Sequence, residues 1–185
     1  MPAFSCYPII VLCPAILLSL LPSPSFGARR PPTPPLSIWQ VNSAEYQVAF
    51  DGKRHKLNNG RMVSGHPSGA DYMDIQVKNT AFGDMNGDGT VDAVVLLAVN
   101  AGGTGTFHEL AVLLNRDGKP VYAATKRGLG DRNNIKALTV SGRTAILDMK
   151  VQGPGDAMCC PTKKVKLKFR LRQRGKTGFQ LVQVR

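Results

Sequence analysis

The chain has 185 residues and carries 24 Lys and Arg against 12 Asp and Glu, which gives a formal net charge of +12. A chain of this length usually forms one domain, buries about two-thirds of its unfolded surface and needs no disulfide staple to fold. The composition therefore excludes a small disulfide scaffold, and the charge favours anionic partners or surfaces over cationic ones.

The first residues predict a secretory signal peptide. Residues 9–21 are almost wholly apolar, and the small residues and proline of a cleavage region follow in residues 23–27. The apolar run is shorter than the ~20 residues of a membrane-spanning helix, so we predict a signal peptide over residues 1–27 with cleavage after Gly27. An uncleaved anchor or a buried core helix is the alternative. We expect an exported protein, periplasmic or secreted, whose mature chain has no transmembrane span.

Prolines dominate the next stretch. Pro31, Pro32, Pro34 and Pro35 favour an extended polyproline segment. We therefore predict a Pro-rich linker over residues 28–42, with an ordinary disordered N-terminus as the alternative. A single β-rich domain is predicted over residues 43–185.

From residue 43 onward, short apolar or alternating stretches are separated by turn residues. Val91 to Val99 is apolar except for Asp92, which is typical of a central strand covered on both faces. Asp117-Gly118 and Ser141-Gly142 are typical of hairpin turns. Further strands are predicted at residues 46–50, 73–77, 107–115, 135–140, 143–151, 163–174 and 179–184. The predicted fold class is mainly β, a single antiparallel β-domain (roll, barrel or sandwich), with no helix after the signal segment.

Residues 84–92 have the spacing of a calcium-binding loop. Calcium takes six to eight oxygen ligands, and alternate residues of such a loop turn their oxygens inward while a glycine permits the sharp bend. Gly89 occupies the bend position, and Val95 stands where an EF-hand has glutamate. The predicted ligands, at loop positions 1, 3, 5, 7 and 9, are Asp84, Asn86, Asp88, Thr90 and Asp92.

The same pattern resembles the strand-flanked DxNxDGxxD calcium loops of FG-GAP, integrin-type propeller repeats. The alternative is a hairpin turn built from Asn86-Gly87 and Asp88-Gly89, which are two strong turn dipeptides. We favour calcium as the cofactor, because three carboxylates so close together repel one another without a cation.

Two adjacent cysteines remain after the signal segment. Of the four cysteines, Cys6 and Cys13 belong to that segment, which leaves Cys159 and Cys160. In an oxidising compartment they can join each other, pair between chains or stay reduced as buried thiols. Neighbouring Cα atoms are about 3.8 Å apart, below the usual range for a disulfide. We therefore expect a Cys159–Cys160 disulfide to shape its loop or respond to redox conditions rather than to add stability.

Residues 163–174 predict a strand with one apolar and one basic face. Val165, Leu167, Phe169 and Leu171 point to one side. The other side carries charges about 6.8 Å apart, from Lys164, Lys166, Lys168, Arg170, Arg172 and Arg174. We expect this row to bind an anionic envelope polymer or lipid headgroups, with a solvated face or a lysine-protected sheet edge as the alternative. No aromatic residues alternate with the charges, which argues against nucleic acid as a partner.

The sequence carries few signals of catalysis. His55, His66 and His108 are widely separated, and His108-Glu109 lacks the second histidine of a metalloprotease motif. No nucleophile elbow surrounds a serine, and no Lys-Ser/Thr pair follows the glycine-rich residues 100–107. We therefore predict that the protein is not an enzyme.

Four segments, in order, resemble the LppP/LprE-type bacterial lipoprotein domain over about residues 81–171. They are AFGDMNGDGTVDAVVLLAVNAGGTGTF, ELAVLLNRDGKPV, LGDRNNIKALTV and QGPGDAMCCPT. The resemblance implies an exported bacterial cell-envelope protein of unassigned biochemical role. A lipidated cysteine needs a small residue before it, whereas Leu12 precedes Cys13, so we expect soluble export rather than a lipid anchor.

Together these features predict a non-catalytic, calcium-braced binding or structural module with a basic face for anionic envelope components. The alternative function is that of a redox-responsive protein acting through Cys159 and Cys160.

Overall fold

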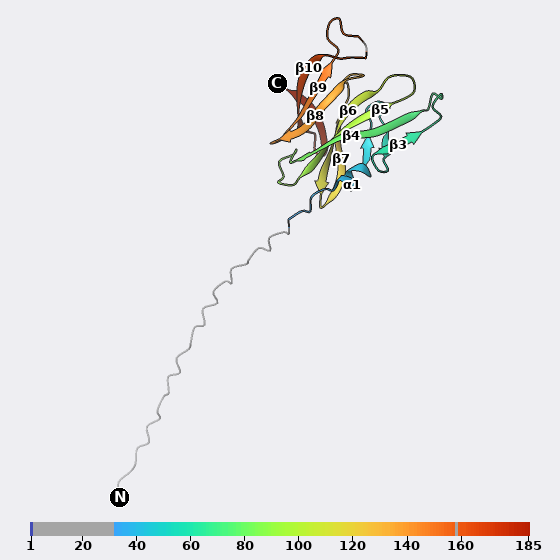
Figure 1. Ribbon diagram of the computed structural model, residues 1–185. Helices are drawn as coiled ribbons and strands as arrows, with labels where there is room; N and C mark the ends of the chain where they lie inside the picture. Colours follow the sequence, from blue (N-terminus) through green and yellow to red (C-terminus); the bar gives the residue numbers. More distant parts are fainter. Residues whose placement is uncertain (2–31, 158) are drawn as a thin grey trace. The chain divides into compact units, whose positions relative to one another are not determined.

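The computed structural model describes Met1, residues 32–157 and residues 159–185 (Figure 1). The predicted signal peptide beyond Met1 and residues 28–31 of the predicted linker lie outside the described residues. Pro32–Arg185 form one compact unit. Within the described residues, no helix is long and apolar enough to cross a membrane.

The described part of the chain is built almost entirely from strands. In chain order the elements are α1 (Ile38–Asn42), β1 (Glu45–Gln47), β2 (Arg54–Lys56), β3 (Arg61–Ser64), β4 (Met73–Gly83), β5 (Asp92–Asn100), β6 (Phe107–Arg116), β7 (Lys119–Lys126), β8 (Asn134–Ser141), β9 (Thr144–Val151), β10 (Lys163–Arg174) and β11 (Gly178–Val184). Every strand pairing is antiparallel. The predicted fold class, mainly β with antiparallel sheets, is therefore confirmed.

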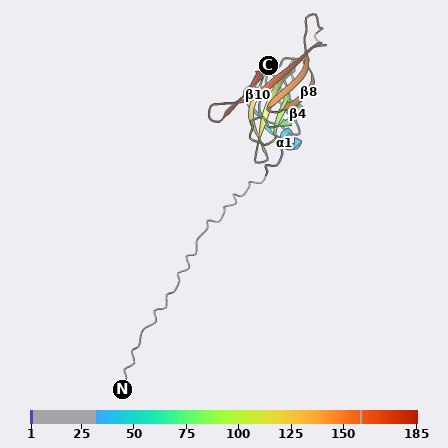
Figure 2. The ribbon, with the colours of Figure 1, turned by 90° about the vertical axis from the view of Figure 1, so that its left-hand side faces the viewer.

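The strands form layers. A five-stranded sheet has the order β3-β4-β5-β6-β7, a four-stranded sheet has the order β11-β10-β9-β8, and β1 pairs with β2. The four-stranded sheet covers one face of the five-stranded sheet, while α1 lies on the other side of it (Figure 1, Figure 2). At the margins β7 lies beside β11 and β4 beside β8. The two larger sheets therefore pack as a sandwich.

The five-stranded sheet is buried on both faces at its centre, as the apolar run at 91–99 predicts. Val94 and Leu96 of β5 belong to the core between the two larger sheets, whereas Val95 and Leu97 belong to a second core on the other face. All four side chains are fully buried. Burial of each contributes about 1.5–3 kcal/mol. β5 is therefore a rigid element, and the loop that joins it to β4 is attached to it.

Residues 36–42, which the sequence assigned to the linker, are part of the folded unit. Ser37 caps α1, since its Oγ accepts a hydrogen bond from Gln40 N (3.2 Å) and Gln40 Oε1 accepts one from Ser37 N (2.8 Å). Leu36 and Val41 are buried in the second core. A five-residue helix is too short to produce a helical periodicity in the sequence, which is why no helix was predicted here.

Candidate functional site

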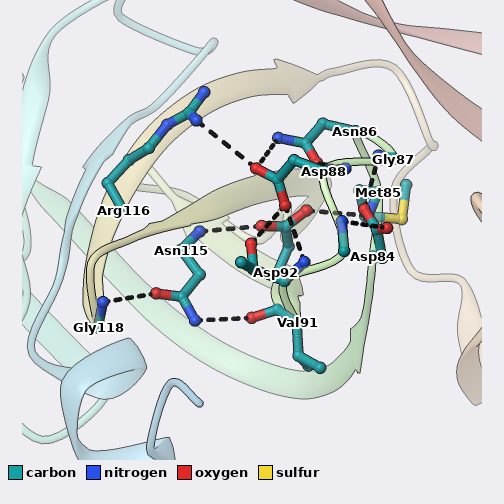
Figure 3. A network of polar contacts seen from close by, with 12 residues as sticks. Asp84, Met85, Asn86, Gly87, Asp88, Val91, Asp92, Asn115, Arg116 and Gly118 are labelled. Atoms are coloured by element: carbon teal, nitrogen blue, oxygen red, sulfur yellow. Dashed lines mark hydrogen bonds and ion pairs between the residues drawn. The ribbon is translucent and has the colours of Figure 1, made fainter. Parts of the chain in front are cut away.

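The Asp84–Asp92 loop connects β4 to β5, and the two strands pair as far as Gly83 and Asp92. Gly87 and Gly89 adopt positive φ angles of 83° and 82°, a region that glycine enters without steric cost. The loop is therefore a tight hairpin connection, as both the calcium and the turn interpretations require (Figure 3).

Backbone amides of the loop bind its own side chains. Asp84 accepts hydrogen bonds from Gly87 N (2.6 Å) and Gly89 N (3.0 Å). Asn86 Oδ1 accepts one from Asp88 N (3.0 Å), and Asp88 Oδ1 accepts one from Thr90 N (2.9 Å) and another from the Thr90 hydroxyl. Side chains at alternate positions thus stabilise the turn by binding the N–H groups two to five residues ahead.

Asp92 joins the loop to the sheet. Its side chain is fully buried, and its two oxygens accept hydrogen bonds from Met85 N and Asn115 N, both at 2.9 Å. Burial raises the pKa of Asp92, the two N–H donors oppose this, and the negative charges of Asp88 and Asp84 add to the rise. Asp92 therefore acts as a buried brace between the loop and β6.

Asn115 extends this network to the N-terminal segment. Its amide nitrogen donates to Pro34 O (2.9 Å) and Val91 O (3.3 Å), and its Oδ1 accepts a hydrogen bond from Gly118 N (2.9 Å). Figure 3 shows Asn115 between Asp92 and the turn that carries Gly118. The loop, the β6–β7 turn and the segment before α1 are thus held together by one amide side chain.

Two arginines supply positive charge beside the loop. Arg116 Nη1 lies 3.6 Å from Asp88 Oδ2, and Arg143 Nη2 donates to Asn86 O at 2.6 Å. Burial acts to raise the pKa of Asp88, but hydrogen bonds from Thr90 and Asn86 and the charge of Arg116 lower it overall. The carboxylates of the loop are therefore balanced in part by groups of the protein itself.

These contacts bear on the predicted calcium site. The five predicted ligands all lie in one short loop, but no group of three or more His, Cys, Asp or Glu among the described residues is arranged to hold a metal ion. A carboxylate oxygen that accepts one N–H still has a second lone pair, so the hydrogen bonds leave room for an ion. Calcium binding stays a prediction. The hydrogen-bond network also agrees with the turn interpretation, because the polar side chains of the loop already have partners within the protein.

The basic row, Lys164 to Arg174, lies where the sequence predicts it. Lys164, Lys166, Lys168, Arg170, Arg172 and Arg174 are all exposed, while the alternate residues Val165, Leu167, Phe169 and Leu171 point toward the core. β10 pairs with β9 on one side and β11 on the other. Both sides of β10 are paired only over residues 168–170, because β11 begins to pair at Lys168. Lys164 and Lys166 therefore lie on a part of β10 that is paired with β9 alone, as the interpretation of a lysine-protected sheet edge requires.

Few contacts neutralise the basic row. Lys166 Nζ lies 3.6 Å from Asp148 Oδ1, and Arg170 Nε donates to Thr144 Oγ1 at 3.0 Å. Lys168 Nζ lies 3.5 Å from the backbone oxygen of Arg185. Among the described residues, Asp148 is the carboxylate that forms an ion pair with the row.

Cys159 and Cys160 lie at disulfide-bonding distance in the segment between β9 and β10. Both residues are exposed, which excludes the alternative of two buried thiols. Asp156 closes the base of the segment, since it accepts hydrogen bonds from Gly153 N and Thr162 N, both at 2.7 Å. Those donors and the Thr162 hydroxyl lower the pKa of Asp156.

The three histidines have different surroundings. His55 Nε2 lies 2.8 Å from Asp51 Oδ2, and His66 Nδ1 lies 2.8 Å from Ser68 Oγ. His108 is buried in β6, and its Nδ1 has no hydrogen-bond partner among the described residues. Sequence reasoning missed the roles of Asn115, Arg116, Arg143 and His108, although a lone histidine among the apolar residues of a predicted strand was a readable signal for the last.

No family model, no curated protein and no solved structure matches the chain. The resemblances to the LppP/LprE-type domain and to FG-GAP calcium loops therefore stay predictions, and the site is interpreted from its geometry.

Proposed function

We propose that the protein is an exported, non-catalytic binding module of the bacterial cell envelope, whose four-stranded sheet binds an anionic polymer. The observation that carries the proposal is the basic row on β10, with all of its side chains exposed. β10 pairs with β9 over residues 163–170 and with β11 over residues 168–174. Every charge of the row therefore lies on backbone that is paired on at least one side.

The spacing of the basic row suits a polymer. Alternate side chains of a strand recur about every 6.8 Å, which matches a chain with an anionic group on each repeating unit better than it matches a single small anion. The net charge of +12 adds a long-range attraction for polyanions. Both the attraction to the basic row and the long-range attraction weaken as salt screens the charges.

Two hollows lie along the basic row. The first hollow has a volume of about 350 Å³ and is lined by Arg143, Arg170, Leu171 and Arg172. The other, of about 460 Å³, lies between β8, β9 and β10 and is lined by Lys136, Asp148, Met149, Lys150, Lys164, Val165 and Lys166. Guanidinium groups bind carboxylate and phosphate oxygens in pairs, so the first hollow offers a place for one anionic group of the polymer.

The test compares two triple variants of equal charge. One replaces three lysines of the basic row, Lys164→Gln, Lys166→Gln and Lys168→Gln. The control replaces three exposed lysines elsewhere, Lys53→Gln, Lys56→Gln and Lys119→Gln. We expect the first variant to bind polygalacturonate at least about tenfold more weakly than the wild type, a loss of about 1.4 kcal/mol, and the control to lose much less.

Vesicles with anionic headgroups separate the polymer from a lipid surface. Retention on such vesicles without polymer binding would assign the row to a membrane surface and overturn the polymer proposal. Equal losses in the two triple variants would show that net charge alone drives binding.

A redox role is the second candidate, because the Cys159–Cys160 pair is exposed. Mass spectrometry of alkylated native protein distinguishes a closed pair from two thiols, before and after mild reduction. Two permanently free and unreactive thiols would contradict this role.

Calcium is the proposed cofactor of the Asp84–Asp92 loop, on the basis of its spacing and of the lone pairs that its hydrogen bonds leave free. In this proposal the ion braces the loop. Arg143 links the loop to the polymer-binding face, because it donates to Asn86 O and also lines the hollow beside Arg170 and Arg172.

A further inference from the structure

A polar hollow opens between the β4–β6 part of the five-stranded sheet and the start of β8. Its volume is about 420 Å³, and its lining includes Lys78, Asn79, Leu96, His108, Asn133 and Asn134. It lies on elements other than β10 and shares no residue with the basic row, so a ligand bound in it is independent of the proposed function.

His108 lines this hollow and keeps a buried ring nitrogen that the fold leaves without a partner. Its side chain is only 8% exposed, and its Nδ1 finds no hydrogen-bond partner among the described residues. Leu110 and Val112, the next residues on the same face of β6, are packed in the core. An unpaired buried polar atom lowers stability, so an apolar residue would suit this position better unless the histidine has a ligand.

Lys78 is placed at the hollow by an irregularity of the sheet. The pairing of β4 with β5 shifts between Val77 and Asn79, which makes Lys78 the extra residue of a β-bulge. Bulges re-aim side chains and are common beside functional sites. Lys78 also lines a neighbouring hollow of about 500 Å³ with Gln76, Asn100 and Thr106, so the two hollows meet at this lysine.

The charges around the hollow leave Lys78 as its cationic group. Asp131 pairs with Arg132 at 3.2 Å, and Asp74 pairs with Arg61 at 2.8 Å. Asp74, which lines the neighbouring hollow, and Asp131, whose charge acts on His108, are therefore already matched by arginines. A single cation beside a buried neutral ring fits a ligand with one negative charge.

The remaining lining groups fit hydroxyls. Asn79, Asn133 and Asn134 carry amides that both donate and accept hydrogen bonds, although Asn133 already donates to Leu129 O. Burial, with a further contribution from the charge of Lys78, lowers the pKa of His108. The ring is therefore neutral near pH 7 and has one donor and one acceptor nitrogen.

We propose that this hollow binds a small hydroxylated carboxylate, of the sugar-acid class, with Lys78 against the carboxylate and the imidazole ring of His108 against a hydroxyl. The side-chain amides of the hollow orient the other hydroxyls.

Calorimetric titration of the full chain tests this proposal, with glucuronate as the ligand and glucose as its neutral counterpart. We expect saturable binding of glucuronate and at least about tenfold weaker binding of glucose. His108→Leu and Lys78→Gln should each weaken glucuronate binding by at least about tenfold, while the control Lys119→Gln should not. His108→Leu should also leave the melting temperature unchanged or higher, because it removes the unpaired nitrogen.

Three results would overturn the proposal. The first is the absence of saturable glucuronate binding, or binding that neither substitution weakens. The second is glucose binding as tight as that of glucuronate. The third is loss of glucuronate binding in the Lys164→Gln, Lys166→Gln, Lys168→Gln variant, which would move the site to the basic row. Lys78 is exposed, so Lys78→Gln keeps the test decisive if His108→Leu fails to fold.

Discussion

Asp92 joins the loop to the sheet, because it is fully buried and binds backbone amides of both Met85 and Asn115. Asp92→Ala leaves these two buried N–H groups without an acceptor. We expect it to lower the free energy of unfolding by about 2–4 kcal/mol, measured by urea denaturation. A loss below about 0.5 kcal/mol would show that the brace is not needed.

The titration of Asp92 gives a dependence on pH with a defined sign. Its pKa is raised above the ordinary 3.8 in the folded protein, so the folded state binds the proton more tightly than the unfolded chain does. The contribution of this group to stability is therefore present below pH 3.8 and is lost as the pH rises through the raised pKa. We expect the stability of the wild type relative to Asp92→Asn to fall over that window, and a rise would contradict the assignment.

Asp88 and Arg116 offer a test of the proposed calcium site. Saturation at 100-fold above the dissociation constant adds about 2.7 kcal/mol, so calcium should raise the melting temperature, and Asp88→Ala should abolish the rise. Arg116 pairs with Asp88 and would compete with the proposed ion, so Arg116→Gln should enlarge the rise in melting temperature. Melting curves with calcium and with a chelator that superimpose for all three proteins would leave only the hydrogen-bonded turn.

At the scale of elements, the close approach of β4 to β8 sets the join between the two sheets. A Cβ atom added at Gly83 would lie 2.5 Å from Val140 Cγ1, so Gly83→Ala forces the strands apart. We expect a loss of about 1–3 kcal/mol. Val140→Ala in the same chain should restore part of it, and a double variant no more stable than Gly83→Ala would contradict this packing.

The sequence was most informative where an element is defined by its own pattern. The full length of β10 follows from its alternation of apolar and basic residues, and Asp117 and Gly118 adopt φ angles of 52° and 79° in the turn that their residue types predict. The helix α1 was missed because five residues carry no periodicity, although Ser37 and Gln40 form a readable capping pair.

At the scale of the whole molecule, the apolar run of β5 predicts a core on each face, but the composition of the second core was beyond sequence reasoning. It depends on Leu36, Val41 and Tyr46 packing on β5, and no local pattern shows which face of a sheet a short segment will cover. The same holds for the loop, since Arg143 reaches Asn86 from far along the chain. Contacts between distant segments can be predicted only when the fold is known.

The layered fold leaves the outer face of the four-stranded sheet uncovered by the other described elements. The five-stranded sheet is covered on one face by the four-stranded sheet and on the other by the N-terminal segment, whereas the outer face of the four-stranded sheet carries the exposed basic row. This is the face to which we propose that an anionic polymer binds, and the small hollow beside His108 is a separate feature.

The most direct test of this account is polygalacturonate binding by the wild type, the Lys164→Gln, Lys166→Gln, Lys168→Gln variant and the Lys53→Gln, Lys56→Gln, Lys119→Gln control, each at low and high salt. The account predicts that the wild type and the control bind at low salt and weaken as salt rises, while the row variant binds at least about tenfold more weakly than either. Equal binding by the two triple variants, or wild-type affinity that does not change with salt, would contradict it.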